Sequence, residues 1–519
     1  MDRSTFVVKR TSARSARESS LSDPASGWSK GLRVATGGQG VIAHAGVVLP
    51  RLLADRIGLT AGLGAVVARR GFTPLRDRGR LLTDAVAALI AGASCLSDVE
   101  ALTRQEALFG PAGGASDTTV LRGLDELADH VNDDGLPDRR LAKMLARVRA
   151  TAWEQIVAER GGLPAVTVAG RPLTHPASTA DADAEGAGAT PVTVVRLDAT
   201  IIESATMKPG VAGHYKGGIG YHPLTAWCTN TGDHLVVMHR PGNAGSFTAS
   251  DHVKVLDAAL AQIPAEHRRD LLVTIDGAGA SHAVIEHLRR WNTAKEHGRR
   301  GRRTEYSIGW PVDERTRAGI EQLPEQAWTL RLTTDGRAEP AEQVADLTGL
   351  LRHSVDGDLL DGWPTDLRVI ASRTPRGAGE QAKLGEDAAW RYGAFATNTP
   401  NGQLQWLDAR HRTQAHVEDK IKELKAMGAE KLPTAHAGRN TAWLQLAALA
   451  VTVTAWLRHL ALDGELKIAE PKSLRFRILN LPAKIVYHAR SKILKIPDGW
   501  AWANDLVNAW DRLQALHPG

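Results

Sequence analysis

The chain has 519 residues, of which 43% are apolar and 24% charged; this composition is typical of a globular protein, and the length predicts two to four structural units. Its two cysteines, Cys95 and Cys228, form no Cys-x-x-Cys pair, which argues against a disulfide framework or a structural zinc site and fits a reducing cytoplasm. The net charge of +6 is modest for this length, so the places where basic residues cluster say more than the total.

The N-terminal part is expected to be helical after a basic arm. Residues 1–40 are basic and rich in Ser and Gly, which predicts a flexible arm, with or without a specific role, and no signal peptide. Residues 41–168 carry apolar residues at three- and four-residue spacing, as amphipathic helices do. The stretch SDTTVLRGLDELADHV begins with Ser116 and Asp117, either of which could cap a helix that presents Arg122 in its first turns. Such a helix is typical of a helix-turn-helix motif that reads DNA, but an ordinary bundle helix explains it equally well.

A change of pattern after residue 190 predicts a mixed sheet. Residues 169–190 are poor in large apolar side chains and are expected to form a linker or surface loop. Residues 191–304 then read as three strands, a helix, a strand and a helix, which is the element order of the RNase H-like fold. The expected strands are 192–200, 222–228, 234–240 and 271–277, and the expected helices are 250–263, capped by Ser250, and 281–291.

The remaining segments complete an α/β architecture. Residues 305–396 hold short strand candidates between charged and Gly/Pro-rich links, which predicts an inserted β-rich subdomain. Residues 397–430 return to the core with a strong helix over 413–428, and residues 431–519 are expected to be helical and basic. The uncharged stretch 441–457 is slightly short for a membrane-spanning helix and contains polar residues, so we expect a buried core helix.

Two of the expected strands end in an acid. Asp198 closes VVRLDAT, and Asp276 follows the strand in VTIDGAG. An Asp at the end of a buried strand costs desolvation free energy unless it binds a metal ion or hydrogen-bond donors, and carboxylate oxygens are the ligands that Mg²⁺ prefers. The alternative is that each Asp caps a turn, as an Asp-Gly pair often does. The strand order favours the metal interpretation for the two acids together.

A third acid is expected from the last helix of the core. Val417, Ile421 and Leu424 form the apolar stripe of this helix, and Glu418 lies at its edge. Spacing alone does not separate Glu418 from Glu423, and a surface Glu-Lys pair is the simpler alternative. Three carboxylates at the centre of such a sheet would suit phosphodiester chemistry with two metal ions. The sequence has no GxxxxGK[ST] loop, so an ATP-driven function is not supported.

These segments resemble those of a known family. The chain looks like the DDE transposases of bacterial insertion sequences, in the branch called insertion-sequence family 1380 of the insertion-sequence-4 group. The resemblance runs from about residue 40 to 500 and is most specific in RLDATIIES, HYKGGIGYHPLTAW, HRPGNAGS, VTIDGAGASH and the helix at 413–428. It implies an RNase H-like catalytic core, with Asp198, Asp276 and Glu418 as the catalytic and metal-binding acids. It also implies two Mg²⁺ or Mn²⁺ ions per site, DNA as the partner and a homodimer in the DNA complex.

The third motif of this family is Tyr, two residues, Arg, three residues, Glu, six residues, Lys. Glu418 and Lys425 match its second half, which implies that Lys425 contacts the transferred DNA end. The Tyr position holds His411 and the Arg position holds Gln414, so the phosphate contacts of those two family residues are not carried over. Arg412 is the expected substitute.

Clusters of basic residues predict further contacts with DNA. Residues 287–303 hold seven Lys or Arg and one Glu, and residues 471–497 hold seven Lys or Arg and no acid. The second run suits a helix that packs by one face and touches phosphates with the other, and a solvated face is the simpler alternative for both runs. Trp310, Trp328 and Trp390 of the insertion could stack on a displaced base, but more simply they fill a core. The expected DNA-contacting residues are Lys425, Lys422, Arg412, Arg299, Arg300, Arg302, Arg303, Arg122, Arg490 and Lys492.

The expected function is that of an insertion-sequence transposase in the bacterial cytoplasm, associated with the nucleoid and with no membrane. It would bind terminal inverted repeats through residues 41–168, cut the DNA ends in a metal-dependent reaction and join them to a target. A nuclease or resolvase of the same fold, which cuts without joining, is the alternative enzyme. A domesticated DNA-binding protein without catalysis is the alternative non-enzyme, although all three acids are present.

Overall fold

The computed structural model describes residues 40–110, 114–175, 189–246, 248–293, 301–354, 357–377, 387, 389–489 and 491–518. The predicted arm up to residue 39, most of the predicted linker and the expected DNA contacts Arg299, Arg300 and Arg490 therefore lie outside the described residues. The described ends of the linker form short strands, β3 Arg171–Pro172, β4 Thr174–His175 and β5 Thr190–Pro191.

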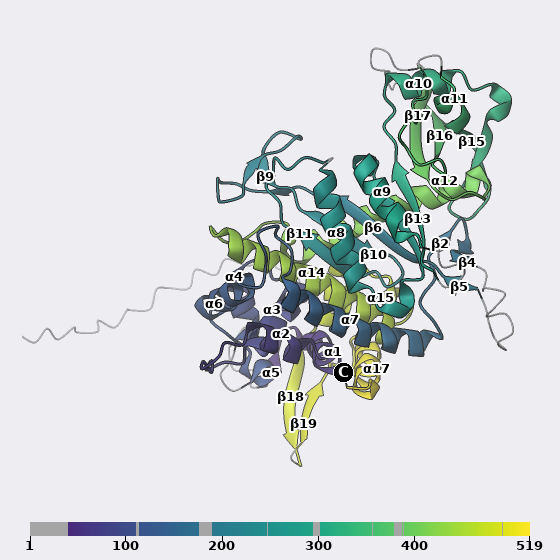
Figure 1. Ribbon diagram of the computed structural model, residues 1–519. Coiled ribbons are helices and arrows are strands. Elements are labelled where there is room, and N and C mark those ends of the chain that lie inside the picture. Colours follow the sequence, from purple (N-terminus) through teal and green to yellow (C-terminus); the bar gives the residue numbers. More distant parts are fainter. Residues whose placement is uncertain are drawn as a thin grey trace, which may run out of the picture. The chain divides into compact units, whose positions relative to one another are not determined.

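A nine-stranded mixed sheet is formed by residues 193–397, in the middle of the chain (Figure 1). Its first five strands lie in the order β11, β10, β6, β12, β13, so the first three strands in the sequence form an antiparallel meander. β12 is parallel to both β6 and β13. The four predicted strands are confirmed, and almost all of their residues are buried. The bounds are β6 Thr193–Ala199, β10 Leu224–Cys228, β11 His234–Met238, β12 Asp270–Ile275 and β13 Arg303–Gly309.

Two helices connect the parallel strands. α8 Ala249–Gln262 leads from β11 to β12, and α9 His282–Trp291 leads from β12 to β13. Their buried apolar residues belong to the same hydrophobic cluster as those of β6 and β12, so both helices cover one face of the sheet. Ser281 caps α9 by accepting a hydrogen bond from the Val284 N–H. The prediction that Ser250 caps α8 is wrong, because the helix begins one residue earlier, after Thr248.

The β-rich segment continues the same sheet instead of forming its own. Strand β17 pairs antiparallel with β13, and β16, β15 and β14 follow outward. The predicted boundary between residues 304 and 305 falls inside β13, which pairs with β12 from Arg303 onward. β15 was not predicted, since Pro340 and charged residues obscure its alternation. The bounds are β14 Thr329–Leu332, β15 Ala338–Asp346, β16 Arg368–Pro375 and β17 Trp390–Thr397, with helices α10 Glu314–Glu321 and α11 Thr348–Arg352 between them.

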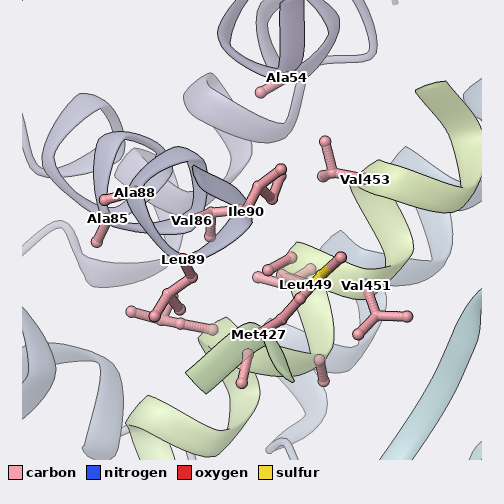
Figure 2. Packing of buried hydrophobic residues seen from close by; sticks show 14 of the residues in the cluster. Ala54, Ala85, Val86, Ala88, Leu89, Ile90, Met427, Leu449, Val451 and Val453 are labelled. Carbon is pink, nitrogen blue, oxygen red and sulfur yellow. The ribbon is translucent and has the colours of Figure 1, made fainter. Parts of the chain in front are cut away.

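The helical N-terminal region packs around a long buried helix, α14 Ala437–Leu460. α14 contacts α1, α3, α6 and α7 as well as β11, and Figure 2 shows Leu449 and Val453 of α14 on the side of the helix that faces Ile90 of α3. It is the one described helix long and apolar enough to cross a membrane, while α3 and α4 would pass only together, across a 100° bend. Its apolar window is wholly buried inside the protein, as predicted for a core helix. The N-terminal helices are α1 Val48–Arg56, α2 Leu59–Val67, α3 Arg78–Ala91, α4 Leu96–Thr103, α5 Glu106–Phe109, α6 Asp117–Ala128 and α7 Arg139–Arg160.

α6 is the helix suggested as a DNA reader. Ser116, one of the two expected caps, caps it by accepting a hydrogen bond from the Thr119 N–H. Val120 and Leu124 are buried where α6 packs on α3 and α14, whereas Arg122 is exposed on its outer face. α6 is thus an integral bundle helix, and the recognition-helix interpretation of its outer face stays a prediction.

The C-terminal region was predicted to be helical, but part of it forms strands. Beyond residue 482 the chain forms a hairpin, because Ala483 and Ile485 point inward while Lys484 points to solvent, an alternation with the period of a strand. β18 also pairs with β1, so the first strand of the described chain lies beside the C-terminal hairpin. The bounds are α15 Gly464–Lys467, α16 Pro471–Leu474, β1 Val41–Ile42, β18 Ala483–His488, β19 Ser491–Lys495 and α17 Ala503–Ala515.

Histidines enclosed by the fold should make its stability depend on pH. Burial lowers the pKa of His234 to about 3, and burial lowers the pKa of His239 and of His411 to about 4. These pKa values lie below the unfolded value of about 6.5, so the unfolded chain binds protons that the folded protein does not. The free energy of unfolding should therefore be highest above pH 6.5 and fall by roughly 1.4 kcal/mol per histidine and pH unit toward pH 4.

Urea unfolding at pH 7.5, 6.0 and 5.0 measures this slope. The ring of His234 packs edge-on against Trp227, with 4.5 Å between ring centroids, so His234→Phe keeps an aromatic ring while it removes one titrating group. In that variant the free energy of unfolding should change less steeply with pH, by the contribution of one histidine. A wild-type stability that stays constant between pH 6.5 and 5.0 would contradict the prediction.

Candidate active site

Asp198 lies near the end of β6, the central strand of the first five. Side chains alternate along a strand, so Leu197 faces α8 and α9 while Asp198 shares the opposite face with Arg196. Arg196 donates from Nη2 to Thr413 Oγ1 at 2.8 Å, which places the helices around residue 413 on this face. Asp198 is partly buried, and its Oδ1 accepts from the Ala199 N–H at 2.8 Å.

Asp276 follows directly after β12. Ile275 is the parallel partner of Leu197, so the next residues of the two strands, Asp276 and Asp198, come side by side at the same edge of the sheet. Gly309 of β13 passes this turn so closely that a Cβ atom there would lie 2.5 Å from the backbone nitrogen of Gly277. The sheet thus brings the two acids together without help from any loop.

The third acid stands on a helix that begins earlier than predicted. The chain is helical from Leu404, with α12 Leu404–Arg412 and α13 His416–Leu424 joined by a tight turn at Thr413–Ala415. The predicted helix at 413–428 is therefore the second half of a longer helical run. That run breaks at Gly428, whose φ of 102° is accessible to few other residues.

Gln414 fixes the start of α13 on the sheet. Its side chain is buried, and its Nε2 donates to the carbonyl oxygen of Leu197 at 2.9 Å. Its Oε1 accepts from Thr274 Oγ1 of β12. Gln414 therefore ties α13 to both of the strands that carry the aspartates. Its neighbour His411 instead packs in the core, stacked on Phe395 with 4.4 Å between ring centroids.

Glu418 and Glu423 leave α13 in different directions. Glu418 is exposed and lines the same pocket as Asp198 and Asp276. Glu423 is buried and forms ion pairs with Lys420, at 3.0 Å, and with Arg458 of α14. Glu418 thus lines the pocket together with the two aspartates, whereas Glu423 attaches α13 to α14.

A pocket of about 700 Å³ holds the three acids. β6, β10 and β12 form its floor, and α13 forms one wall. The expected DNA contacts Lys422 and Lys425 line this wall, and Lys216, which was not predicted as a site residue, lines the pocket as well. The full lining is Asp198, Ala199, Thr200, Tyr215, Lys216, His222, Leu224, Ser246, His252, Ile275, Asp276, Gln414, Ala415, Val417, Glu418, Ile421, Lys422 and Lys425.

The pocket concentrates charge of both signs. Burial, followed by the negative charges of Asp276 and Glu418, raises the pKa of Asp198 to about 7. Burial and the positive charge of Lys216 lower the pKa of Lys425. Acids thus repel acids and lysines repel lysines within one cavity. A cation beside the acids and a polyanion beside the lysines would relieve both repulsions.

Residues 181–518 match the model of the family described as transposase DDE domain, group 1. The match covers well over half of the chain. The chain belongs to this family of DDE transposases. A solved structure of piggyBac transposase, in a synaptic complex with hairpin DNA, aligns with a TM-score of 0.39 and 8% identity over 84% of this chain and 80% of that chain. No curated protein matches the sequence significantly.

The donors in the transposase pocket suit divalent cations. Three carboxylates face one cavity, and their mutual repulsion is what a cation would offset. Within the described part of the chain, no three His, Cys, Asp or Glu side chains are grouped closely enough to hold one ion together. Mg²⁺ does not require such a group, because it keeps several waters and is commonly held by one or two carboxylates together with substrate phosphates.

Two histidines of the pocket were missed in the sequence. His222 Nδ1 lies 2.9 Å from the Ala244 carbonyl oxygen, and His252 Nδ1 lies 3.0 Å from the Thr248 carbonyl oxygen. A carbonyl only accepts, so each Nδ1 carries the hydrogen and each Nε2 keeps a lone pair. Burial lowers the pKa of both rings, so both are neutral near pH 7. His222 stands in the family-like stretch HYKGGIGYHPLTAW, which was the available signal.

Other expected DNA contacts of the transposase lie away from the pocket. Arg412 pairs with Asp408 at 2.8 Å, donates to the Leu332 carbonyl and does not line the pocket. Arg302 and Arg303 lie at the start of β13, the opposite end of the strands from Asp276. Arg122 and Lys492 do not line the pocket, and the Lys492 ammonium donates to the Ala107 carbonyl.

The three tryptophans of the β-rich segment do not line the pocket either. The Arg373 guanidinium lies over the rings of Trp328 and Trp390, 4.4 Å from each centroid. Trp310 packs edge-on against Trp363, with 5.0 Å between centroids. Packing within the β-rich segment, the simpler of the two interpretations, accounts for all three.

Proposed function

We propose that the protein is an insertion-sequence transposase of family 1380 that cuts the ends of its element and joins them to target DNA at an RNase H-like core. The observation that carries the proposal is the meeting of Asp198, Asp276 and Glu418 in one pocket, from two neighbouring strands and one helix. The spatial strand order 3-2-1-4-5 of the first five strands supports the RNase H-like assignment.

In this proposal the three acids hold two Mg²⁺ or Mn²⁺ ions, which when bound activate the attacking oxygen and stabilise the leaving oxygen. Lys216, Lys422 and Lys425 hold the phosphates of the DNA strand across the same pocket. Helices of residues 41–168 bind the terminal inverted repeats, and two copies of the chain bring two ends together. The protein acts on DNA in the bacterial cytoplasm, at the nucleoid.

The direct test is to incubate the purified protein with DNA that carries the boundaries of its own element, Mg²⁺ and a target plasmid, and to sequence the products. We expect breaks at the element ends and junctions between those ends and the target. Breaks without junctions would indicate the nuclease or resolvase alternative. Binding to the ends without any metal-dependent break would indicate a domesticated DNA-binding protein.

A further inference from the structure

A small hairpin contributes a short loop to the edge of the active-site pocket. Strands β7 Ile202–Glu203, β8 Ala212–Gly213 and β9 Ile219–Tyr221 form a three-stranded sheet, and residues 214–218 turn between β8 and β9. We call residues 214–218, His-Tyr-Lys-Gly-Gly, the HYKGG loop. The loop closes with a hydrogen bond from the His214 N–H to the Gly218 carbonyl at 3.1 Å.

The two glycines shape this loop. Gly217 has a φ of 78° and Gly218 a φ of 128°, conformations that other residues rarely adopt. The tight turn leaves Tyr215 and Lys216 at the tip, and both of these residues line the pocket that holds Asp198.

Tyr215 presents a large ring to solvent at a charged cavity. It is 73% exposed, and it is the one Phe, Tyr or Trp among the described residues that line the pocket. The nearest ring is that of His222, 6.0 Å away between centroids and tilted by 56°, so the Tyr215 ring is not stacked within the protein. An exposed aromatic face at such a place is suited to a flat ligand.

Lys216 places a positive charge over this ring. Its Nζ lies 5.6 Å from the centroid of the Tyr215 ring. Its charge also influences Asp198 and Lys425, so it stands within electrostatic reach of the acids and of the opposite wall. An aromatic ring next to a cation is the combination by which proteins hold single nucleic-acid strands: the ring stacks on a base, and the cation meets a phosphate.

A buried histidine in the same loop points to a bound partner. His214 is only 8% exposed, and neither of its ring nitrogens has a hydrogen-bond partner among the described residues. A buried polar group without a partner is costly. A group that enters the loop from the pocket side could supply the partner that the described residues do not.

We propose that the HYKGG loop holds the DNA strand next to the phosphate that is cut, with the ring of Tyr215 stacked on a nucleobase and Lys216 on the neighbouring phosphate. This proposal rests on the function proposed above for the pocket. It assigns base stacking to Tyr215 instead of the tryptophans of the β-rich segment, which pack against Arg373 and Trp363. The Tyr215 hydroxyl takes no part in bond breaking.

The test uses the full-length Asp198→Asn protein, which should bind but not cut, and element-end DNA with 2-aminopurine at one position at a time. We expect a large fluorescence change at one or two positions beside the cut site. Tyr215→Ala should abolish that change and weaken end binding by about 5- to 100-fold, the range for loss of one stacked base. Tyr215→Phe keeps the ring and should give the same fluorescence change and the same end binding as the protein with Tyr215. Met207→Ala is the matched control, because Met207 is 70% exposed near the same small sheet but does not line the pocket.

Each outcome decides the matter. If the complex forms and wild type cuts the ends, but no 2-aminopurine signal depends on Tyr215, the stacking role is wrong and the proposed function stands. If Tyr215→Phe stops cleavage as completely as Tyr215→Ala, the hydroxyl acts in the chemistry and the stacking role is again wrong. If wild type neither binds nor cuts element ends, the proposed function fails and the loop proposal fails with it.

Discussion

Replacement of Asp198 by asparagine should reduce cleavage of element ends by roughly 10³-fold or more while the protein still binds those ends. Asparagine keeps the size of the side chain but removes the negative charge that we propose holds the ions. A gel assay of end cleavage in Mg²⁺, beside a binding assay with the same DNA, measures both quantities. Cleavage by this variant at the wild-type rate would refute the assignment of the acids.

Loss of folding does not explain the expected effect. The raised pKa of Asp198 means that its ionised form is disfavoured in the folded protein, so the metal-free wild type is destabilised by this carboxylate above pH 7. The metal-free Asp198→Asn variant should then be at least as stable as wild type at pH 8, measured by thermal unfolding. Added Mn²⁺ should stabilise wild type and have little effect on the variant.

The two glutamates of α13 supply a matched pair for the same assay. Glu418→Gln should stop cleavage as Asp198→Asn does, with little change in stability, because Glu418 is exposed in the pocket. Glu423→Gln should lower the free energy of unfolding, because it removes the charge that pairs with Lys420 and with Arg458. It should leave cleavage by the folded protein intact. The opposite result would show that the third acid is Glu423.

Arg149→Ala should produce the largest loss of stability, about 3–5 kcal/mol in the free energy of unfolding. Arg149 of α7 is 3% exposed and pairs with Asp233, which is fully buried, at 2.9 Å. It also donates to the His234 carbonyl at 2.7 Å and to Gln262. Removal of the guanidinium leaves the carboxylate of Asp233 buried without its cation, and urea unfolding at pH 7.5 measures the cost.

The same helix offers the control. Arg147 is exposed two residues earlier on α7, so Arg147→Ala should change the free energy of unfolding by less than about 0.5 kcal/mol. Equal effects of the two substitutions would mean that the buried pair contributes nothing special. Arg149→Met combined with Asp233→Leu should recover part of the loss, since the pair is then replaced by apolar contacts.

The local pattern of apolar residues was enough to predict the strands and the position of Asp198 and Asp276 at the ends of two of them. The β-branched runs before Asp198 and Asp276 are buried because both faces of the sheet are covered, and such runs are legible in a single sequence. The order of these runs along the chain was enough to predict that the acids end neighbouring strands. The hairpin at 483–495 differs from the predicted helix, because Ala483, Lys484 and Ile485 alternate between buried and exposed with the period of a strand.

What the sequence could not provide depends on partners distant in the chain. Glu418 and Glu423 are equivalent by spacing, and only Arg458 of α14 shows which of them is used for packing. The role of Gln414 depends on Thr274 and Leu197, more than 130 residues away. Lys216 and Tyr215 stood in a stretch that was noted for its family likeness, but nothing local indicated that this stretch reaches the acids.

The burial of the apolar stretch of α14 constrains how this enzyme can diversify. The helix packs against both the N-terminal bundle and the edge strand β11 of the catalytic sheet. Without α14, each of these parts would expose apolar residues to solvent. We propose that the N-terminal helices bind the repeats. They cannot be exchanged between relatives as one unit, because a transplanted bundle would have to pack against the α14 of another protein. New end specificity should arise instead by point changes on outer faces, such as that of Arg122 on α6.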